Sequence, residues 1–142
     1  MIISMKFPPL ERLAELFSQY PDIQAVYLFG SVAQGRVHAE SDLDLAIIPR
    51  HSSLSASKLD ILTELGRAGF DNVDLVVLDR DDIVLNYEAV RPNRVVYQTD
   101  DFDSASMYSR VVRQYLDFLP YLKVQREAYK RRILFDPAGS HS

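Results

Sequence analysis

Cysteine is absent from this chain of 142 residues, and so are long apolar runs. Without cysteine the protein can form neither a disulfide framework nor a thiolate zinc site, which fits a reducing cytoplasm. No apolar run approaches the roughly 20 residues that a membrane-spanning helix needs. Segment 1–13, MIISMKFPPLERL, has no long apolar stretch and no small-residue cleavage site, so we expect no signal peptide and a cytoplasmic location.

What the chain does contain is typical of one soluble domain with a hydrophobic core, at 47% apolar and 25% charged residues. The net charge of −4 is unevenly distributed, because segment 104–134 has seven basic and two acidic residues, or +5, and the rest must therefore carry −9. The basic residues are Arg110, Arg113, Lys123, Arg126, Lys130, Arg131 and Arg132. This asymmetry indicates either a surface for a partner or anionic ligand, or a solvated helix face.

Hydrophobic periodicity predicts helices that alternate with short strands. The predicted helices are 8–19, 55–69, 81–90 and 104–133, and the predicted strands are 23–30, 42–49, 72–79 and 94–98. This order predicts an α/β (α+β) fold in which helices pack on a small mixed sheet. We expect residues 1–134 to form a single domain and 135–142 to be a flexible tail.

Several helix boundaries can also be predicted. Ser55 or Ser57 is expected to cap the second helix, and Gly66 or Gly69 to end it. Acidic residues are expected in the first turn of the third helix, where the helix dipole favours them. Pro120 removes one backbone hydrogen bond from the last helix, so a kink or a break is expected there.

Three aspartates on two predicted strands form the main candidate site. Asp42 and Asp44 are two residues apart and therefore project from the same face of their strand. Asp74 joins them on that face if its strand pairs alongside. Carboxylates this close repel one another unless cations neutralise them, and Mg²⁺ prefers oxygen ligands. Taken singly, they can also be solvated residues at strand ends.

A glycine-containing loop, GSVAQGRV, joins the first two strands. It is not a Walker A loop, because Arg36 and Val37 stand where lysine and serine or threonine are required. Gly30 can allow a tight turn, and Ser31 can begin a helical turn whose amides and hydroxyl hold a phosphate. A strand-ending glycine followed by a capping serine is the simpler interpretation.

Taken together, Gly30-Ser31, the Asp42-x-Asp44 pair and the later Asp74 resemble the DNA polymerase β-type nucleotidyltransferase superfamily. Segment 27–48, YLFGSVAQGRVHAESDLDLAII, is similar to the core of its minimal members, the MNT-type antitoxins encoded beside HEPN-domain toxins. One departure is Gln34, which stands where many relatives have arginine, and Arg36 is a nearby substitute.

The resemblance implies a polymerase β-like fold and transfer of AMP from ATP to a tyrosine hydroxyl of a HEPN ribonuclease toxin, which silences it. It implies that Asp42, Asp44 and Asp74 hold two Mg²⁺ ions and are the catalytic residues. It also implies that Gly30, Ser31 and Ser41 bind the nucleotide.

Three alternatives remain open at this point. A small-molecule nucleotidyltransferase, for example one that modifies an aminoglycoside, usually has an added helical domain that this chain lacks. An antitoxin that acts by binding alone has no need of three repelling carboxylates. A nucleic-acid-extending enzyme is disfavoured by a short acidic chain, so we expect no direct nucleic-acid binding.

The basic C-terminal segment is the candidate docking surface for the toxin. Tyr87 and Tyr97 are expected in the core rather than against a base.

Overall fold

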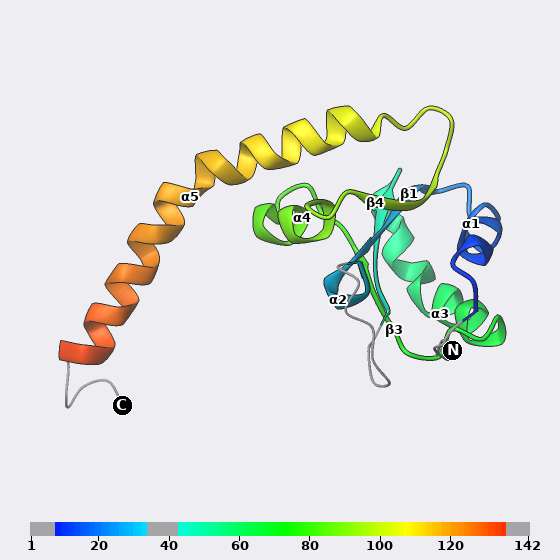
Figure 1. Cartoon of the computed structure of the whole chain (residues 1–142), viewed down its shortest axis with the longest axis horizontal. Coiled ribbons are helices and arrows are strands. Elements are labelled where there is room, and N and C mark those ends of the chain that lie inside the picture. Colours follow the sequence, from blue (N-terminus) through cyan, green and yellow to red (C-terminus); the bar gives the residue numbers. More distant parts are fainter. Residues whose placement is uncertain (1–7, 34–42, 136–142) are drawn as a thin grey trace, which may run out of the picture.

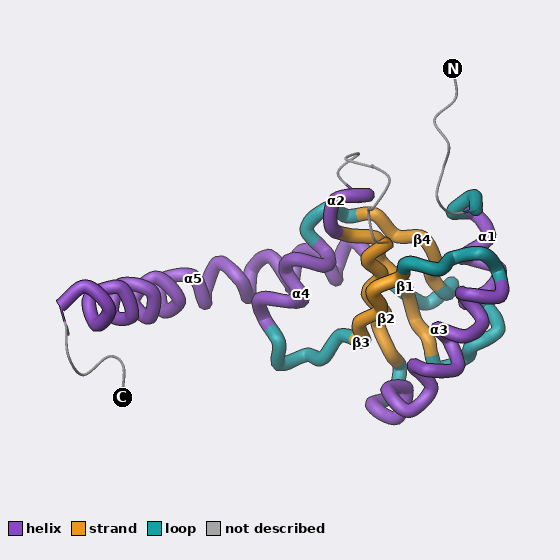
Figure 2. The backbone as a smooth tube through the Cα atoms, turned by 90° about the horizontal axis from the view of Figure 1, so that it is seen from below, coloured by secondary structure: helices purple, strands orange, loops and turns teal. Residues whose placement is uncertain are grey.

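The computed structural model describes residues 8–33 and 43–135, with only the backbone described at 31, 32, 52, 53 and 135. Its centre is a four-stranded sheet in the order β3-β2-β1-β4 (Figures 1 and 2). The strands are β1 (Ile23–Phe29), β2 (Leu43–Pro49), β3 (Val73–Val77) and β4 (Arg94–Gln98). Strand β1 is antiparallel to both β2 and β4, whereas β2 and β3 are parallel. The predicted mixed sheet is therefore confirmed.

Helices cover both faces of this sheet. They are α1 (Glu11–Phe17), α2 (Gly30–Ala33), α3 (Lys58–Arg67), α4 (Ile83–Val90) and α5 (Ser104–Phe135), with a 3₁₀ helix, η1 (Ser52–Ser57), before α3. Helices α1 and α3 pack on one face, and α4 with the first part of α5 packs on the other. Of the helices in the described residues, none has the length and hydropathy of a membrane span.

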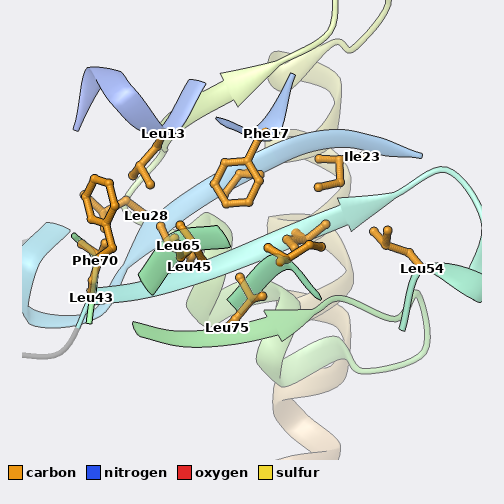
Figure 3. Packing of buried hydrophobic residues seen from close by; sticks show 13 residues of the cluster. Leu13, Phe17, Ile23, Leu28, Leu43, Leu45, Leu54, Leu65, Phe70 and Leu75 are labelled. Atoms are coloured by element: carbon orange, nitrogen blue, oxygen red, sulfur yellow. The ribbon is translucent and has the colours of Figure 1, made fainter. Parts of the chain in front are cut away.

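The alternation along β2 explains the two-sided core. Leu43, Leu45 and Ile47 point towards α1 and α3, where they pack against residues such as Phe17 and Leu65 (Figure 3). Ala46 and Ile48 point the other way, towards α4 and α5. Because successive strand residues face opposite sides, the same alternation directs Asp44 to the α4 side of the sheet.

The ends of α3 differ in part from the prediction. Ser57 is the N-cap residue, but its side chain makes no capping hydrogen bond, because η1 leads directly into the helix. At the other end Gly69, not Gly66, terminates the helix, with φ of +99°. The amide of Phe70 donates to the Leu65 carbonyl at 2.8 Å, and that of Gly69 donates to the Gly66 carbonyl at 3.0 Å. This is the Schellman arrangement, in which a glycine adopts the left-handed conformation.

Helix α4 begins at Ile83, directly after Asp81 and Asp82, the acidic residues that were expected in its first turn. Asp82 is its N-cap residue, and the carboxylate accepts a hydrogen bond from the Leu85 amide at 3.1 Å. The first turn itself contains no acidic residue. The acidic side chain therefore acts as a cap, which satisfies an amide that has no partner within the helix.

The last helix, α5, is not broken at Pro120. It runs unbroken from Ser104 to Phe135 with the proline inside it, and its axis changes direction partway along (Figure 1). Pro120 cannot donate to the carbonyl of Leu116, four residues earlier. Leu116 is exposed, so that carbonyl lies on a solvent-facing part of the helix. The expectation of a break is wrong, and that of a kink agrees with the curved axis.

Candidate active site

Two of the three predicted aspartates lie side by side at one end of the sheet. Asp44 is the second residue of β2 and Asp74 is the second residue of β3, and the parallel pairing places them directly in register. Neighbouring strands are about 4.8 Å apart, and residues in register project from the same face. Asp74 was expected to share a face with Asp44 if these two strands pair, and the structure shows that they do.

The surroundings leave this pair accessible. Helices α4 and α5 cover the same face of β2 further along, at Ala46 and Ile48. Asp44 is half-buried and Asp74 is exposed. Of the described elements, α4 and α5 therefore pack further along the sheet and leave these two carboxylates accessible to a ligand.

Gly30 lies against Asp44 at the turn from β1 into α2. It has φ of +74°, and the strand pairing places the preceding Phe29 opposite Asp44. A Cβ atom on residue 30 would collide with Oδ2 of Asp44 and would lie 2.9 Å from its Cγ. Both the left-handed backbone and this close approach require glycine. The predicted tight turn at Gly30 therefore lies in direct contact with the side chain of Asp44, one of the predicted site residues.

The donor chemistry of this pair suits a hard divalent cation. Ionised carboxylates that project in register from neighbouring strands repel each other, by on the order of 1 to 3 kcal/mol at about 5 Å, depending on the local dielectric. Bound Mg²⁺ would remove that repulsion through oxygen ligands, its preferred type. Within residues 8–33 and 43–135 no group of three or more His, Cys, Asp or Glu residues is placed to hold a metal. Asp44 and Asp74 are the two of the three expected ligand residues that the structure describes.

The remaining predicted site residues are only partly described. Ser41 and Asp42 lie outside the described residues, as do Gln34 and Arg36. Ser31 is the second residue of α2, and its backbone alone is described. In the sequence Asp42 directly precedes Leu43, the first residue of β2.

Arg94 is a residue at this end that the sequence did not reveal. It is the first residue of β4, pairs with Leu28, and its Nη1 donates to the Ala33 carbonyl oxygen at 3.3 Å. The hydrogen bond joins β4 to the end of α2 across 61 residues of sequence. A guanidinium group is therefore fixed beside the helix that begins at Gly30. A local sequence pattern cannot predict a hydrogen bond between residues so far apart in the chain.

Other features lie away from these carboxylates. Tyr87 stacks on Tyr115 with ring centroids 3.8 Å apart, and Tyr97 packs near Phe17 at 6.5 Å. Both are half-buried and pack against the hydrophobic core, in agreement with the expectation. A cavity of about 1050 Å³ lies at the opposite end of the sheet, where Pro49 and Leu78 are among its lining residues. It includes none of Gly30, Asp44 and Asp74.

Comparison with known proteins identifies the family. The polymerase beta nucleotidyltransferase family matches residues 11–102, which include β1 to β4 and the pair Asp44 and Asp74. The chain belongs to the polymerase beta nucleotidyltransferase family. In this family context, the turn at Gly30 and the paired strands are parts of a nucleotidyltransferase fold.

One similar protein matches part of the chain. The protein adenylyltransferase MntA of Shewanella oneidensis is 31% identical over 83 residues, which are 58% of this chain and 60% of that protein. The match therefore spans less than two thirds of that relative.

Solved structures share the fold over nearly the whole chain. A chain in a crystal structure of a toxin–antitoxin with AMP-PNP superposes with a TM-score of 0.67 at 24% identity, covering 89% of this chain and 99% of that one. A chain in the structure of tri-AMPylated Shewanella oneidensis HEPN toxin in complex with MNT antitoxin gives 0.60 at 21% identity, covering 88% and 95%. These similarities confirm the predicted polymerase β-like fold.

Proposed function

We propose that this chain is a protein adenylyltransferase that acts as an antitoxin. It transfers AMP from ATP to a tyrosine hydroxyl of a partner HEPN ribonuclease toxin and so silences that toxin. The observation that carries the proposal is the in-register pair Asp44 and Asp74 beside Gly30, in a chain of the nucleotidyltransferase family. The name of the MntA relative and the AMPylated toxin in the neighbouring structure supply the acceptor class.

The reaction exchanges one phosphate bond for another. The tyrosine oxygen forms a bond to the α-phosphorus of ATP, the bond from that phosphorus to the bridging oxygen of the β-phosphate breaks, and pyrophosphate leaves. The proton of the tyrosine hydroxyl passes to a carboxylate of the site or to solvent. The protein contributes by positioning the reactants and by neutralising charge.

Each site residue has a proposed role. Asp42, Asp44 and Asp74 would hold two Mg²⁺ ions, which would lower the pKa of the incoming hydroxyl and balance the charge of the triphosphate. Asp74 also helps to activate the acceptor hydroxyl. Gly30 and Ser31 hold the triphosphate, and Ser41 supports its binding. The domain that carries these residues is proposed to be 1–134.

The test is transfer to the protein encoded next to this one. Both proteins are purified and incubated with ATP and Mg²⁺, and the intact mass of the neighbour is followed. We expect addition of adenylyl groups to tyrosine, with a loss of at least about 10³-fold in rate in Asp42→Ala/Asp44→Ala, since that pair supplies most of the metal ligands. Asp71→Ala, an exposed carboxylate before β3, is the matched control and should retain full rate.

One outcome would reject the proposed function, and another would reject the proposed site. A tight complex with no added mass would show neutralisation by binding alone. Unchanged transfer by the double variant would show that the catalytic site lies elsewhere.

A further inference from the structure

The second half of α5 extends beyond the body of the protein as an uncovered helix. Figures 1 and 2 both show it projecting away from the sheet. All residues from 123 to 134 are exposed, whereas Met107 and Val111 near the start of α5 are only 8% and 1% exposed. We call residues 119–135 the arm.

One apolar stripe runs along α5 from the buried part into the arm. Its residues recur at spacings of three, four or seven, which places them on one helix face. They are Met107, Val111, Tyr115, Phe118, Leu122, Tyr129 and Ile133. Met107 and Val111 pack into the core with α4, and Tyr115 stacks on Tyr87. The same face ends uncovered, at Tyr129 and Ile133, which are 61% and 52% exposed.

Charge distinguishes the arm from the rest of the molecule. The arm contains five basic residues and one acidic residue, so its charge is +4 and the remainder of the chain carries −8. Arg126 and Lys130 lie along one side of the stripe, and Arg132 lies on the other. A partner surface that fits this arm is an apolar groove bordered by carboxylates.

A second copy of this chain fits less well. Two arms paired along their stripes would bring two segments of charge +4 together, and these would repel each other. An arm placed on the acidic body of another copy would form a head-to-tail contact, which generates open chains unless the rotation closes. Charge therefore favours a different protein as the occupant.

We infer that the arm is the docking element that holds the toxin to be modified, and that the toxin offers an acid-bordered apolar groove to the stripe. The inference rests on the proposed function for the identity of the partner. Because the stripe continues the face of α5 that packs on α4, a protein bound along it lies on the same side of α5 as the body. The bend of α5 turns the arm towards the side where α4 and α2 lie (Figure 1). Docking there brings the acceptor near the sheet end that presents Asp44.

A pair of matched variants tests the inference. Tyr129→Ser/Ile133→Ser removes the exposed part of the stripe, and Val124→Ser/Leu134→Ser removes two exposed apolar residues of the same arm that face away from it. Affinity for the purified neighbouring protein is measured by titration calorimetry, and Mg²⁺–ATP binding is measured as a check on the body. We expect the stripe variant to bind the neighbour at least roughly 30-fold more weakly, since central aromatic anchors dominate interfaces. The control should bind as the unchanged protein does, and both should bind nucleotide normally.

The results separate this inference from the proposed function. Binding that depends on the stripe, without any AMP transfer, supports the docking arm and rejects the transferase. AMP transfer that the stripe variant performs equally well at limiting partner concentration rejects the arm and keeps the transferase. The arm is also rejected if the unchanged protein does not bind the neighbour. Stripe-dependent dimerisation in light scattering, or stripe-dependent binding to phosphatidylserine vesicles in place of the neighbour, rejects it too.

Discussion

Replacing Gly30 by alanine should damage both the turn after β1 and the carboxylate beside it. At φ of +74° an L-residue costs about 1 to 2 kcal/mol relative to glycine. The added methyl would also lie 2.9 Å from Cγ of Asp44 and 3.3 Å from its Cβ, so the side chain of Asp44 must rotate away. Of these two effects, the first lowers stability and the second displaces a proposed metal ligand.

The size of each effect can be estimated separately. For a domain of this length, 1 kcal/mol shifts Tm by about 2 to 4 °C, so Gly30→Ala should lower Tm by roughly 2 to 8 °C. A displacement of about 1 Å at a catalytic group commonly costs about 10²-fold in rate. We therefore expect a folded variant with moderately reduced Tm and at least about 10²-fold slower adenylyl transfer.

Gly66→Ala is the matched control for this experiment. Gly66 lies inside α3, its added Cβ meets nothing within 4 Å, and its φ is not positive. Alanine should stabilise that helix by about 0.5 to 1 kcal/mol and leave transfer unchanged. Thermal unfolding and the rate of adenylyl transfer are measured for both variants. Wild-type activity in Gly30→Ala would refute the role given to the contact between Gly30 and Asp44.

Two further predictions concern groups away from the site. Hydrogen bonds from Arg50 and Thr99 hold the pKa of Asp101 well below its usual range, so this carboxylate stabilises the fold above about pH 4 and loses that effect as pH falls towards its folded pKa. The difference in Tm between the unchanged protein and Asp101→Asn should therefore shrink below pH 4, and a gap that stays constant down to pH 3 would contradict this. Burial raises the pKa of Tyr27 to about 12, and its hydroxyl has no hydrogen-bond partner within the described parts of the chain. Tyr27→Phe should thus be neutral or stabilising by up to about 1 kcal/mol in urea denaturation, whereas a clear loss of stability would reveal a polar partner.

Local patterns in the sequence predict much of this fold. The apolar runs at 23–30 and 42–49 predict the buried strands β1 and β2. Strands β2 and β3 do pair, which was the condition for Asp44 and Asp74 to share a face. The turn at Gly30 and the helical turn after it were likewise visible, because few residues other than glycine can end a strand in this way. The positions of Asp44 and Asp74 in the sheet were therefore predictable, because these residues follow strand periodicity.

The features that could not be predicted depend on contacts between distant segments. The hydrogen bond from Arg94 to Ala33 joins segments 61 residues apart, so no local pattern reports it. The 3₁₀ helix η1 leads directly into α3, so α3 begins without a side-chain cap. Helix propensity alone does not show whether a helix begins with a side-chain cap or with a 3₁₀ turn. Pro120 remains within α5, although isolated helices are strongly destabilised by an internal proline.

The most direct test of the account is to locate metal and nucleotide on this protein. Crystals are grown with Mn²⁺ in place of Mg²⁺ and with a non-hydrolysable ATP analogue, and anomalous difference density is measured. We expect Mn²⁺ peaks within coordination distance of the carboxylates of Asp44 and Asp74, with the triphosphate beside Gly30. Nucleotide and metal bound elsewhere, for example in the cavity at the opposite end of the sheet, would contradict it.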